Sequence, residues 1–293
     1  ITDAEVTLHG RLLNLLTHPD AEHRRSAAVV LGAVGVDSSD ALDGLRKTLK
    51  DGDPTVRRAA VEALGALAPK TLVRDLRPLL KDPDPSARGA AKRVLAEGSG
   101  VLLEDLAKML EAKDEKQRVG AIAVLGARGG AEARRMLLAQ LPLGSPKVQE
   151  AVRDALAPDI AVLPPDELIP FLHELDSALV EAGDEATGRC GAALVSLLEG
   201  IDHGAVTGVL SRVAASDAPV EVRVRAVEAL RTASRGHRGA QEHVFKTLVG
   251  ILENPATPPG LLTAAADTLG SMDLPIALEP RVRALTRAES KPV

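Results

Sequence analysis

The chain has 293 residues, of which 45% are hydrophobic and 26% are charged, a balance typical of a globular protein with a large buried core. It has no Trp, no Tyr and only two Phe, so Leu, Val, Ile and Ala must build the core, and a β protein is disfavoured. The net charge of −5 excludes a global positive field that would attract nucleic acid or an anionic membrane.

The negative charge is concentrated in the middle third of the chain. Residues 101–200 carry 17 acidic and 10 basic side chains, whereas the flanking thirds are close to balanced. Two interpretations stay open for this segment: a solvated acidic outer face, or a docking surface for a basic partner.

Cysteine usage and hydropathy bear on the location of the protein. Cys190 is the only cysteine, so no intrachain disulfide forms, and we expect a cytoplasmic protein. No apolar run approaches the ~20 residues that span a bilayer. The first residues are not typical of a signal peptide, and because the sequence starts at Ile1 instead of Met, a longer N-terminus is one expectation.

One sequence pattern recurs along the chain. Its clearest copy, residues 53–65, reads Asp-Pro-Thr-Val-Arg-Arg-Ala-Ala-Val-Glu-Ala-Leu-Gly. The apolar residues follow the spacing of one helix face, Asp53 suits an N-cap, and Pro54 suits the first helical position. Further copies, each predicted to be a helix, occupy residues 20–32, 84–95, 114–126 and 217–230, with weaker copies at 145–156, 184–198 and 258–270.

Another apolar stripe precedes most copies and predicts a second helix in each unit. In chain order these stripes lie at 42–49, 72–80, 102–110, 136–141, 206–213 and 244–252. The unit is therefore helix A, a tight turn and helix B, repeated about eight times, with a last unpaired helix near 276–287. Because one such pair cannot bury its own apolar face, the pairs must stack, and the sequence predicts an all-α fold, a right-handed α-solenoid.

The repeated pattern Asp-Pro-x-Val-Arg-x-x-Ala-x-x-Ala-Leu-Gly resembles helix B of HEAT repeats, in particular the short bacterial HEAT-like repeats of the phycobilisome-lyase type. The resemblance covers nearly the whole chain. It implies the HEAT solenoid fold but indicates almost nothing about function, because HEAT arrays serve many roles. Pro78 and Pro170 lie inside predicted A helices, and the resemblance implies that these helices are kinked.

Acidic and basic residues recur at one spacing within the helix B pattern. Each Asp lies where an N-cap is expected, and an Arg follows about one turn later. The resemblance implies that these residues form a structural ladder that ties each repeat to the next, and not a set of catalytic acids. The predicted ladder residues are Asp20 and Arg24, Asp53 and Arg57, Asp84 and Arg88, Asp114 and Arg118, and a looser pair, Asp184 and Arg189.

The spacing of the ladder also predicts an irregularity. Both members are lost at the fifth copy, where Ser145 and Gln149 replace Asp and Arg, and extra residues follow in the proline-containing segment 157–165. We expect about five repeats over residues 1–157 and about three longer, irregular ones over 158–293, within one continuous solenoid. The segment is either an irregular joint or a slightly longer loop.

The sequence offers little that suggests catalysis. It has neither a Gly-x-x-x-x-Gly-Lys phosphate loop nor a Gly-x-Ser-x-Gly elbow. His18 and His23 flank Asp20, but this set is a weak metal signal, and Cys190 is expected to be a buried inert thiol. We therefore predict no catalytic residue, no metal and no cofactor.

Two enzyme classes with HEAT-like folds stay open as alternatives. Arg57, Arg58, Arg88, Lys92 and Arg93 could form the basic patch of an alkylpurine DNA glycosylase, but no Trp or Tyr could stack on a base, so nucleic acid is disfavoured as a partner. The second alternative is a bilin lyase, for which no constellation that would hold a tetrapyrrole is present.

The pattern favours a non-catalytic scaffold or adaptor that binds another protein or peptide through the B-helix face. A regulatory segment of a larger protein is a further alternative. Helical phase places a set of charged residues on the solvent side of the B helices, the predicted concave face. The predicted partner-binding residues are Arg25, Arg58, Glu62, Lys92, Arg93, Glu150, Arg153, Asp154, Arg225 and Glu228.

Overall fold

The computed structural model describes residues 10–35, 38–67, 71–98, 103–199, 201, 203–234 and 238–272. Every regular element in these ranges is a helix, and the helices belong to two compact units, Ile1–Asp159 and Ile160–Val293. The prediction of an all-α solenoid of stacked helix pairs is confirmed in the described ranges. The expected last helix near 276–287 lies outside them.

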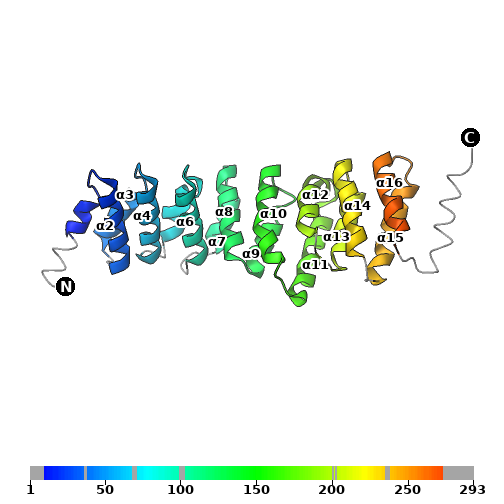
Figure 1. Cartoon of the computed structure of the whole chain (residues 1–293), viewed down its shortest axis with the longest axis horizontal. Coiled ribbons are helices and arrows are strands. Elements are labelled where there is room, and N and C mark those ends of the chain that lie inside the picture. Colours follow the sequence, from blue (N-terminus) through cyan, green and yellow to red (C-terminus); the bar gives the residue numbers. More distant parts are fainter. Residues whose placement is uncertain are drawn as a thin grey trace, which may run out of the picture. The chain divides into compact units, whose positions relative to one another are not determined.

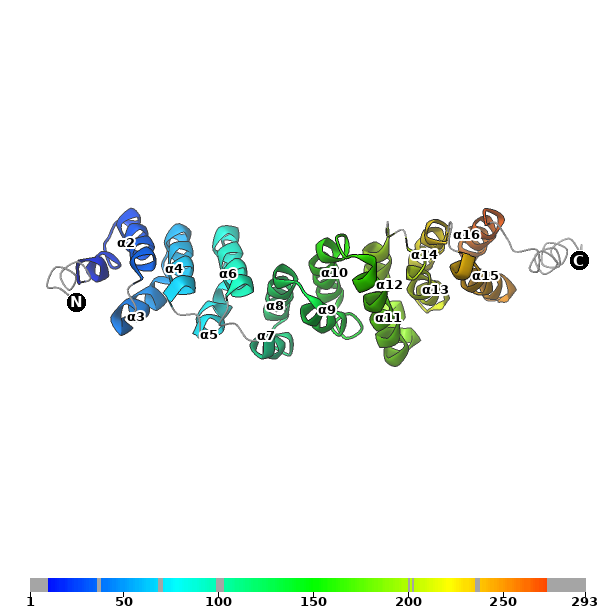
Figure 2. The same ribbon diagram turned by 90° about the horizontal axis from the view of Figure 1, so that it is seen from below.

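The first unit has two layers of helices. Even-numbered helices, which are the predicted B helices, pack side by side in one layer (Figure 1), and Figure 2 shows the odd-numbered A helices in the other. A helical segment over residues 10–15 precedes α2. The following helices are α2 (Ala21–Val34), α3 (Ser39–Thr48), α4 (Pro54–Leu67), α5 (Leu72–Leu76), the 3-10 helix η2 (Arg77–Lys81), α6 (Pro85–Glu97), α7 (Leu103–Leu110), α8 (Glu115–Arg128), α9 (Ala131–Leu138) and α10 (Pro146–Ile160).

The second unit repeats this pairing with longer helices. Helix α12 packs on α14 and α14 on α16, while α11 packs on α13 and α13 on α15, so the same two layers form. The helices are α11 (Pro165–Ala182), α12 (Asp184–Leu198), α13 (Val206–Ala215), α14 (Val220–Ala233), α15 (Arg238–Glu253) and α16 (Pro259–Gly270).

A leucine at one repeat position forms the centre of the first unit's core. In each B helix it lies eleven residues after the N-cap position, and its side chain is fully buried. These leucines are Leu31, Leu64, Leu95, Leu125 and Leu156. Burial of one leucine stabilises the fold by about 1.5–3 kcal/mol relative to exposure, so the regular spacing of this residue explains why the pairs stack.

Proline acts differently in two of the A helices. Pro78 is the second residue of the 3-10 helix η2, which follows directly on α5; the α-helix ends here because proline has no N–H for its hydrogen-bond ladder. Pro170 lies inside α11, which continues to Ala182. Pro158 lies inside α10, which ends only at Ile160, the fourth residue of the segment 157–165 that was predicted to be an irregular joint or a longer loop.

Glycines allow neighbouring B helices of the first unit to approach closely. A Cβ on Gly32 of α2 would lie 2.8 Å from the Cα of Ala63 on α4, closer than side chains approach a backbone. The same crowding would occur at Gly65 of α4 and at Gly126 of α8. The equivalent residue of α6 is Ala96, so α6 cannot approach its neighbour in this way.

A lysine further separates α6 from α8. Lys92 is exposed, whereas Ala28, Val61 and Ile122 at the equivalent position of α2, α4 and α8 are fully buried. Burying an unpaired ammonium in such an interface is prohibitively costly. Helix α8 packs partly on η2 and less extensively on α6 than α4 does, and in Figure 2 it lies nearer the odd-numbered layer than α6. The junction between α6 and α8 is therefore open.

Aspartates cap the regular B helices, and this gives a prediction for stability. The Asp53 carboxylate accepts from the backbone N–H of Thr55 (2.8 Å) at the start of α4. Asp53→Ala should lower the free energy of unfolding by about 1 kcal/mol because it leaves this donor unpaired, as measured by urea denaturation. Asp53→Asn, which keeps the acceptor, is the matched control, and an equal loss in both variants would contradict the capping role.

Candidate protein-interaction surface

Two arginines of the first unit are held by carboxylates of the following repeat. Arg24 on α2 donates through Nε and Nη2 to Asp51 (2.7 and 2.9 Å), and Arg57 on α4 donates in the same way to Asp82 (2.8 and 2.7 Å). Nη1 of each arginine donates to two backbone carbonyls in the turn before its own helix. We call each such arrangement a closed rung. It needs the fork of donors that a guanidinium provides.

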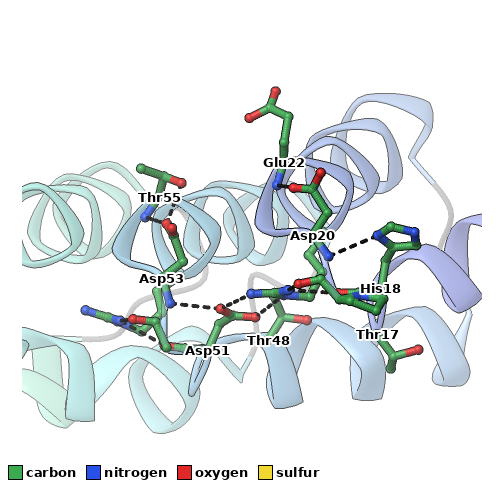
Figure 3. Close-up of polar contacts among 12 residues, drawn as sticks. Thr17, His18, Asp20, Glu22, Thr48, Asp51, Asp53 and Thr55 are labelled. Atoms are coloured by element: carbon green, nitrogen blue, oxygen red, sulfur yellow. Dashed lines mark hydrogen bonds and ion pairs between the residues drawn. The ribbon is translucent and has the colours of Figure 1, made fainter.

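The carboxylates of the closed rungs correct the predicted ladder. The predicted aspartates are N-caps, whereas the carboxylates that bind the arginines lie two residues earlier, at Asp51 and Asp82. Asp51 also accepts from the N–H of Asp53 (2.9 Å), as Figure 3 shows. His18 occupies the same position in the first repeat, and its Nδ1 accepts from the N–H of Asp20 (3.1 Å).

The third rung is open. Ala112 stands at the position of Asp51 and Asp82, so the following turn offers no carboxylate to Arg88. Arg88 Nη1 still donates to the backbone carbonyls of Asp82 (2.6 Å) and Pro83 (2.8 Å). Its Nε and Nη2, the two donors that hold the carboxylate in the closed rungs, have no partner within the described ranges.

The ladder does not continue beyond this point. The Arg118 guanidinium has no partner in the described part of the chain, its Nε is buried, and Leu143 stands at the carboxylate position. At the next arginine position, Gln149 Nε2 donates to the carbonyls of Leu141 and Gly144 (both 3.1 Å). The glutamine amide thus replaces the arginine Nη1 that donates to the turn carbonyls, but it does not replace the Nε and Nη2 donors that hold a carboxylate.

The predicted pair Asp184 and Arg189 is not a rung. Asp184 is the first residue of α12, whose N-cap is Gly183, and it makes no capping hydrogen bond. Arg189 donates to Glu185 (2.6 Å), one turn earlier on the same exposed helix face. This pair joins no two repeats, because both members lie on one helix.

The closed rungs should make the fold sensitive to acid. Hydrogen bonds from Arg24 hold the pKa of Asp51 below its ordinary value. Burial raises the pKa of Asp82, but the hydrogen bonds from Arg57 and from the Asp84 N–H, together with the charges of Arg57 and Arg88, outweigh burial and lower it overall. A carboxyl whose pKa is lower in the folded than in the unfolded protein stabilises the fold at any pH above its unfolded-state pKa of about 4. This stabilisation is lost as the pH falls from that value through the pKa of the folded state.

The free energy of unfolding should therefore decline below about pH 4, measured by urea denaturation over a pH series at constant ionic strength. Asp82→Asn removes one of the titrating carboxylates, so its decline should be shallower than that of the unmodified protein. Parallel pH profiles for the two proteins would contradict this assignment.

A groove lies at the open junction between α6 and α8. Its volume is about 690 Å³, and the turn 80–83, the first turns of α6 and α8, and the start of α10 line it. Gly89, Gly120 and Ala123 form its small-residue floor. We call it the α6–α8 groove. The chain has no aromatic residue before Phe171, so none lines it.

The α6–α8 groove carries an excess of positive charge. Lys81 and Asp82 line it as well, but Lys81 is paired with Asp114 and Asp82 with Arg57. Four further cations line the groove and form no ion pair with a carboxylate within the described ranges: Arg88, Lys92, Lys116 and Lys147. The charge of Arg88 also acts on Asp82. Unpaired cations that line one groove focus a positive potential there, although the chain as a whole is acidic.

Only part of the predicted partner-binding set lies together near this groove. Lys92 lines the groove itself. Glu62 on α4 accepts from Arg58 Nε (3.1 Å) and from Arg93 Nη2 on α6 (3.0 Å), beside a smaller groove of about 500 Å³ that Glu62 and Arg93 line. Glu97 also lines this smaller groove, so its charges are close to balanced.

Two more groups of predicted residues are paired within single helices. Arg25 on α2 donates to Glu22 (3.0 Å), three residues earlier. On α10, Arg153 donates to Asp154 (2.9 and 2.6 Å) and lies 3.5 Å from Glu150. Exposed pairs of this kind contribute little energy but compensate each other's charge.

The last two predicted residues belong to the second unit. Arg225 on α14 donates to Glu199 (2.7 Å) and to Ser196 (3.3 Å), and Glu228 is exposed.

Sequence reasoning missed Lys116 and Lys147, two lysines that line the α6–α8 groove, although a signal existed. Both lie two residues after the N-cap position, so lysine recurs at one repeat position in two successive B helices.

The described residues offer little for metal or thiol chemistry. They contain no group of three His, Cys, Asp or Glu side chains arranged to hold a metal ion. The His18 and His23 rings lie 4.2 Å apart, and His23 Nδ1 is 3.4 Å from Asp20. Cys190 is fully buried in α12, and burial raises the pKa of its thiol to about 11, so the reactive thiolate is scarce at neutral pH. No described helix is both long and apolar enough to cross a membrane.

A family match agrees with this fold over part of the chain. Residues 11–96 match the HEAT-repeat family. No curated protein matches the sequence. Among solved structures, the complex of CpcE and CpcF of phycocyanin lyase from Nostoc sp. PCC7120 is 20% identical, with 83% of this chain and 94% of that chain covered and a TM-score of 0.34.

Two further structures show the range of proteins that this chain resembles. The karyopherin Kap121p bound to the SUMO protease Ulp1p is 14% identical, with 90% of this chain and 37% of that chain covered and a TM-score of 0.47. Human deoxyhypusine hydroxylase is 19% identical, with 90% and 83% covered and a TM-score of 0.27. The HEAT-repeat match thus covers the start of the first unit, and the described helices of each unit, taken by itself, form stacked pairs.

Proposed function

We propose that the protein is a non-catalytic scaffold that binds another protein through the B-helix layer of its first unit, with the α6–α8 groove as the docking site. One observation carries this proposal: four cations that form no ion pair in the described residues line one open groove, whereas its other two charged lining residues, Lys81 and Asp82, are paired. A groove of this charge attracts a partner with an acidic surface and accelerates its association.

The open form of the groove and the small residues in its lining also support a macromolecular ligand. Its floor of small residues lets a polypeptide backbone approach α6 and α8, and its open form suits an extended segment better than an enclosed small molecule. The single buried cysteine is compatible with the cytoplasmic location that belongs to this proposal.

The proposal can be tested by affinity purification from the native cells followed by quantitative mass spectrometry. The groove variant carries Lys92→Ser, Lys116→Ser and Lys147→Ser. The matched control carries Lys47→Ser, Lys50→Ser and Lys108→Ser, which change the net charge equally at exposed positions outside the groove. At least one protein should be retained by the unmodified protein and the control but lost from the groove variant.

A set of retained proteins that does not depend on the groove would contradict the docking site. Purified protein assayed for base release from alkylated DNA, and for the absorbance of a bound chromophore, tests the enzyme alternatives. Activity that is abolished by one polar substitution in the groove would show that the protein is an enzyme and would contradict the scaffold proposal.

A further inference from the structure

We infer that the open third rung is a carboxylate-binding site, in which Arg88 takes an aspartate or glutamate side chain from an acidic segment of a partner protein. This inference deepens the proposed function and rests on it, because it names the chemistry of the partner at the same groove. The partner's carboxylate would take the place that Asp51 and Asp82 occupy in the closed rungs.

The closed rungs show which atoms form such a site. In both, Nη1 is bound to the carbonyls of the preceding turn, and this contact directs Nε and Nη2 toward the carboxylate of the next repeat. Arg88 Nη1 makes the same contact with Asp82 and Pro83. Its fork is therefore oriented before any partner arrives, which lowers the entropic cost of binding.

The position of Arg88 makes its fork accessible. Arg88 lines the α6–α8 groove, where Ala96 and Lys92 keep α6 and α8 apart. Lys92, Lys116 and Lys147 line the same groove and would contact further acidic residues on either side of the bound carboxylate. An extended segment with several acidic side chains fits this arrangement better than a single carboxylate ion.

A carboxylate is favoured over a nucleic acid for two reasons. The same guanidinium atoms already bind carboxylates in the two closed rungs, at 2.7–2.9 Å. Binding of single-stranded nucleic acid depends on aromatic side chains that stack on bases, and the chain has no aromatic residue before Phe171.

Arg88→Gln tests the inference without removing the contact that Arg88 makes with its own turn. Gln149 shows that glutamine at this repeat position donates to the turn carbonyls, so the variant should fold, and its thermal melting should confirm this. Arg135→Gln is the matched control, because Arg135 is exposed on α9 outside the groove and is already paired with Glu132. Binding of fluorescein-labelled poly-L-glutamate to the full chain is followed by fluorescence anisotropy.

Arg88→Gln should weaken poly-L-glutamate binding by about tenfold or more, because two charge-assisted hydrogen bonds are lost, while Arg135→Gln should change it less than about twofold. Equal weakening in both variants, or none in Arg88→Gln, overturns the inference. If the triple lysine variant alone loses binding, the groove remains the docking site and only the role of Arg88 fails.

The same titration with oligothymidylate decides between the two classes of polyanion. Oligothymidylate should bind more weakly than poly-L-glutamate at equal charge and ionic strength. Binding as tight as that of poly-L-glutamate, with the same sensitivity to Arg88→Gln, would overturn the carboxylate assignment in favour of a phosphate backbone. If the unmodified protein binds no poly-L-glutamate, the inference fails, and the affinity purification still decides the proposed function separately.

Discussion

Arg57→Gln should lower the free energy of unfolding of the first unit by about 3 kcal/mol, one of the largest effects expected of a single substitution in this chain. The side chains of Arg57 and Asp82 are only 12% and 7% exposed. Glutamine can still reach the turn carbonyls, as Gln149 does, but it leaves the Asp82 carboxylate without its guanidinium. A buried carboxylate that loses its cationic partner has a large desolvation cost.

The loss of stability in Arg57→Gln should be local to the second and third repeats, which Arg57 joins. Urea denaturation measures its size, and hydrogen–deuterium exchange of peptides from α4 and α6 should show its location. Arg58→Gln, at the neighbouring exposed position (53% exposed), should change stability by less than about 0.5 kcal/mol. Similar losses in both variants would show that the closed rung contributes no more than a surface ion pair.

Gly32→Ala should destabilise the first unit, although alanine is the better helix former. The new Cβ would lie 2.8 Å from the Cα and 2.9 Å from the Cβ of Ala63, so α2 and α4 would have to separate. Overpacking of this kind costs about 1–3 kcal/mol, while the gain in helix propensity is about 1 kcal/mol, so a net loss is expected.

Gly89→Ala on α6 is the matched control, because no atom lies within 4 Å of its added Cβ. Here the helix propensity acts alone, so thermal melting should show stabilisation by up to about 1 kcal/mol. The two substitutions should thus have opposite signs. Stabilisation by Gly32→Ala would mean that the two helices are free to move apart, and that close packing at this position is unimportant.

The fold was predictable because each unit carries its own signals. Asp53 and Pro54 mark the start of a helix, and the leucine equivalent to Leu64 recurs in each copy, so both the helix and its buried face follow from local sequence. The proline signal was less reliable. Pro158 lies in the segment 157–165, which was expected to be an irregular joint or a longer loop, yet α10 continues through it to Ile160, because loss of one hydrogen bond is tolerated in the last turn.

The candidate site was only partly predictable, because it depends on contacts between repeats. Asp51 and Asp82 precede the N-cap aspartates by two residues, a spacing visible in the sequence, but only the structure shows that they receive Arg24 and Arg57. The groove depends on residues that differ from the repeat pattern. A comparison of Lys92 with its buried equivalents could have indicated an open junction, because a charged residue then stands at a core position.

The open junction between α6 and α8 also affects how the first unit unfolds. In a stacked array, stability is a sum of terms for each repeat and for each interface between neighbours, so the interface with the least contact limits the cooperativity of the whole. With looser packing between α6 and α8, the repeats before and after this junction should behave as two separate cooperative blocks in native-state exchange. A partner that occupies the groove would then join these blocks and suppress the opening between them.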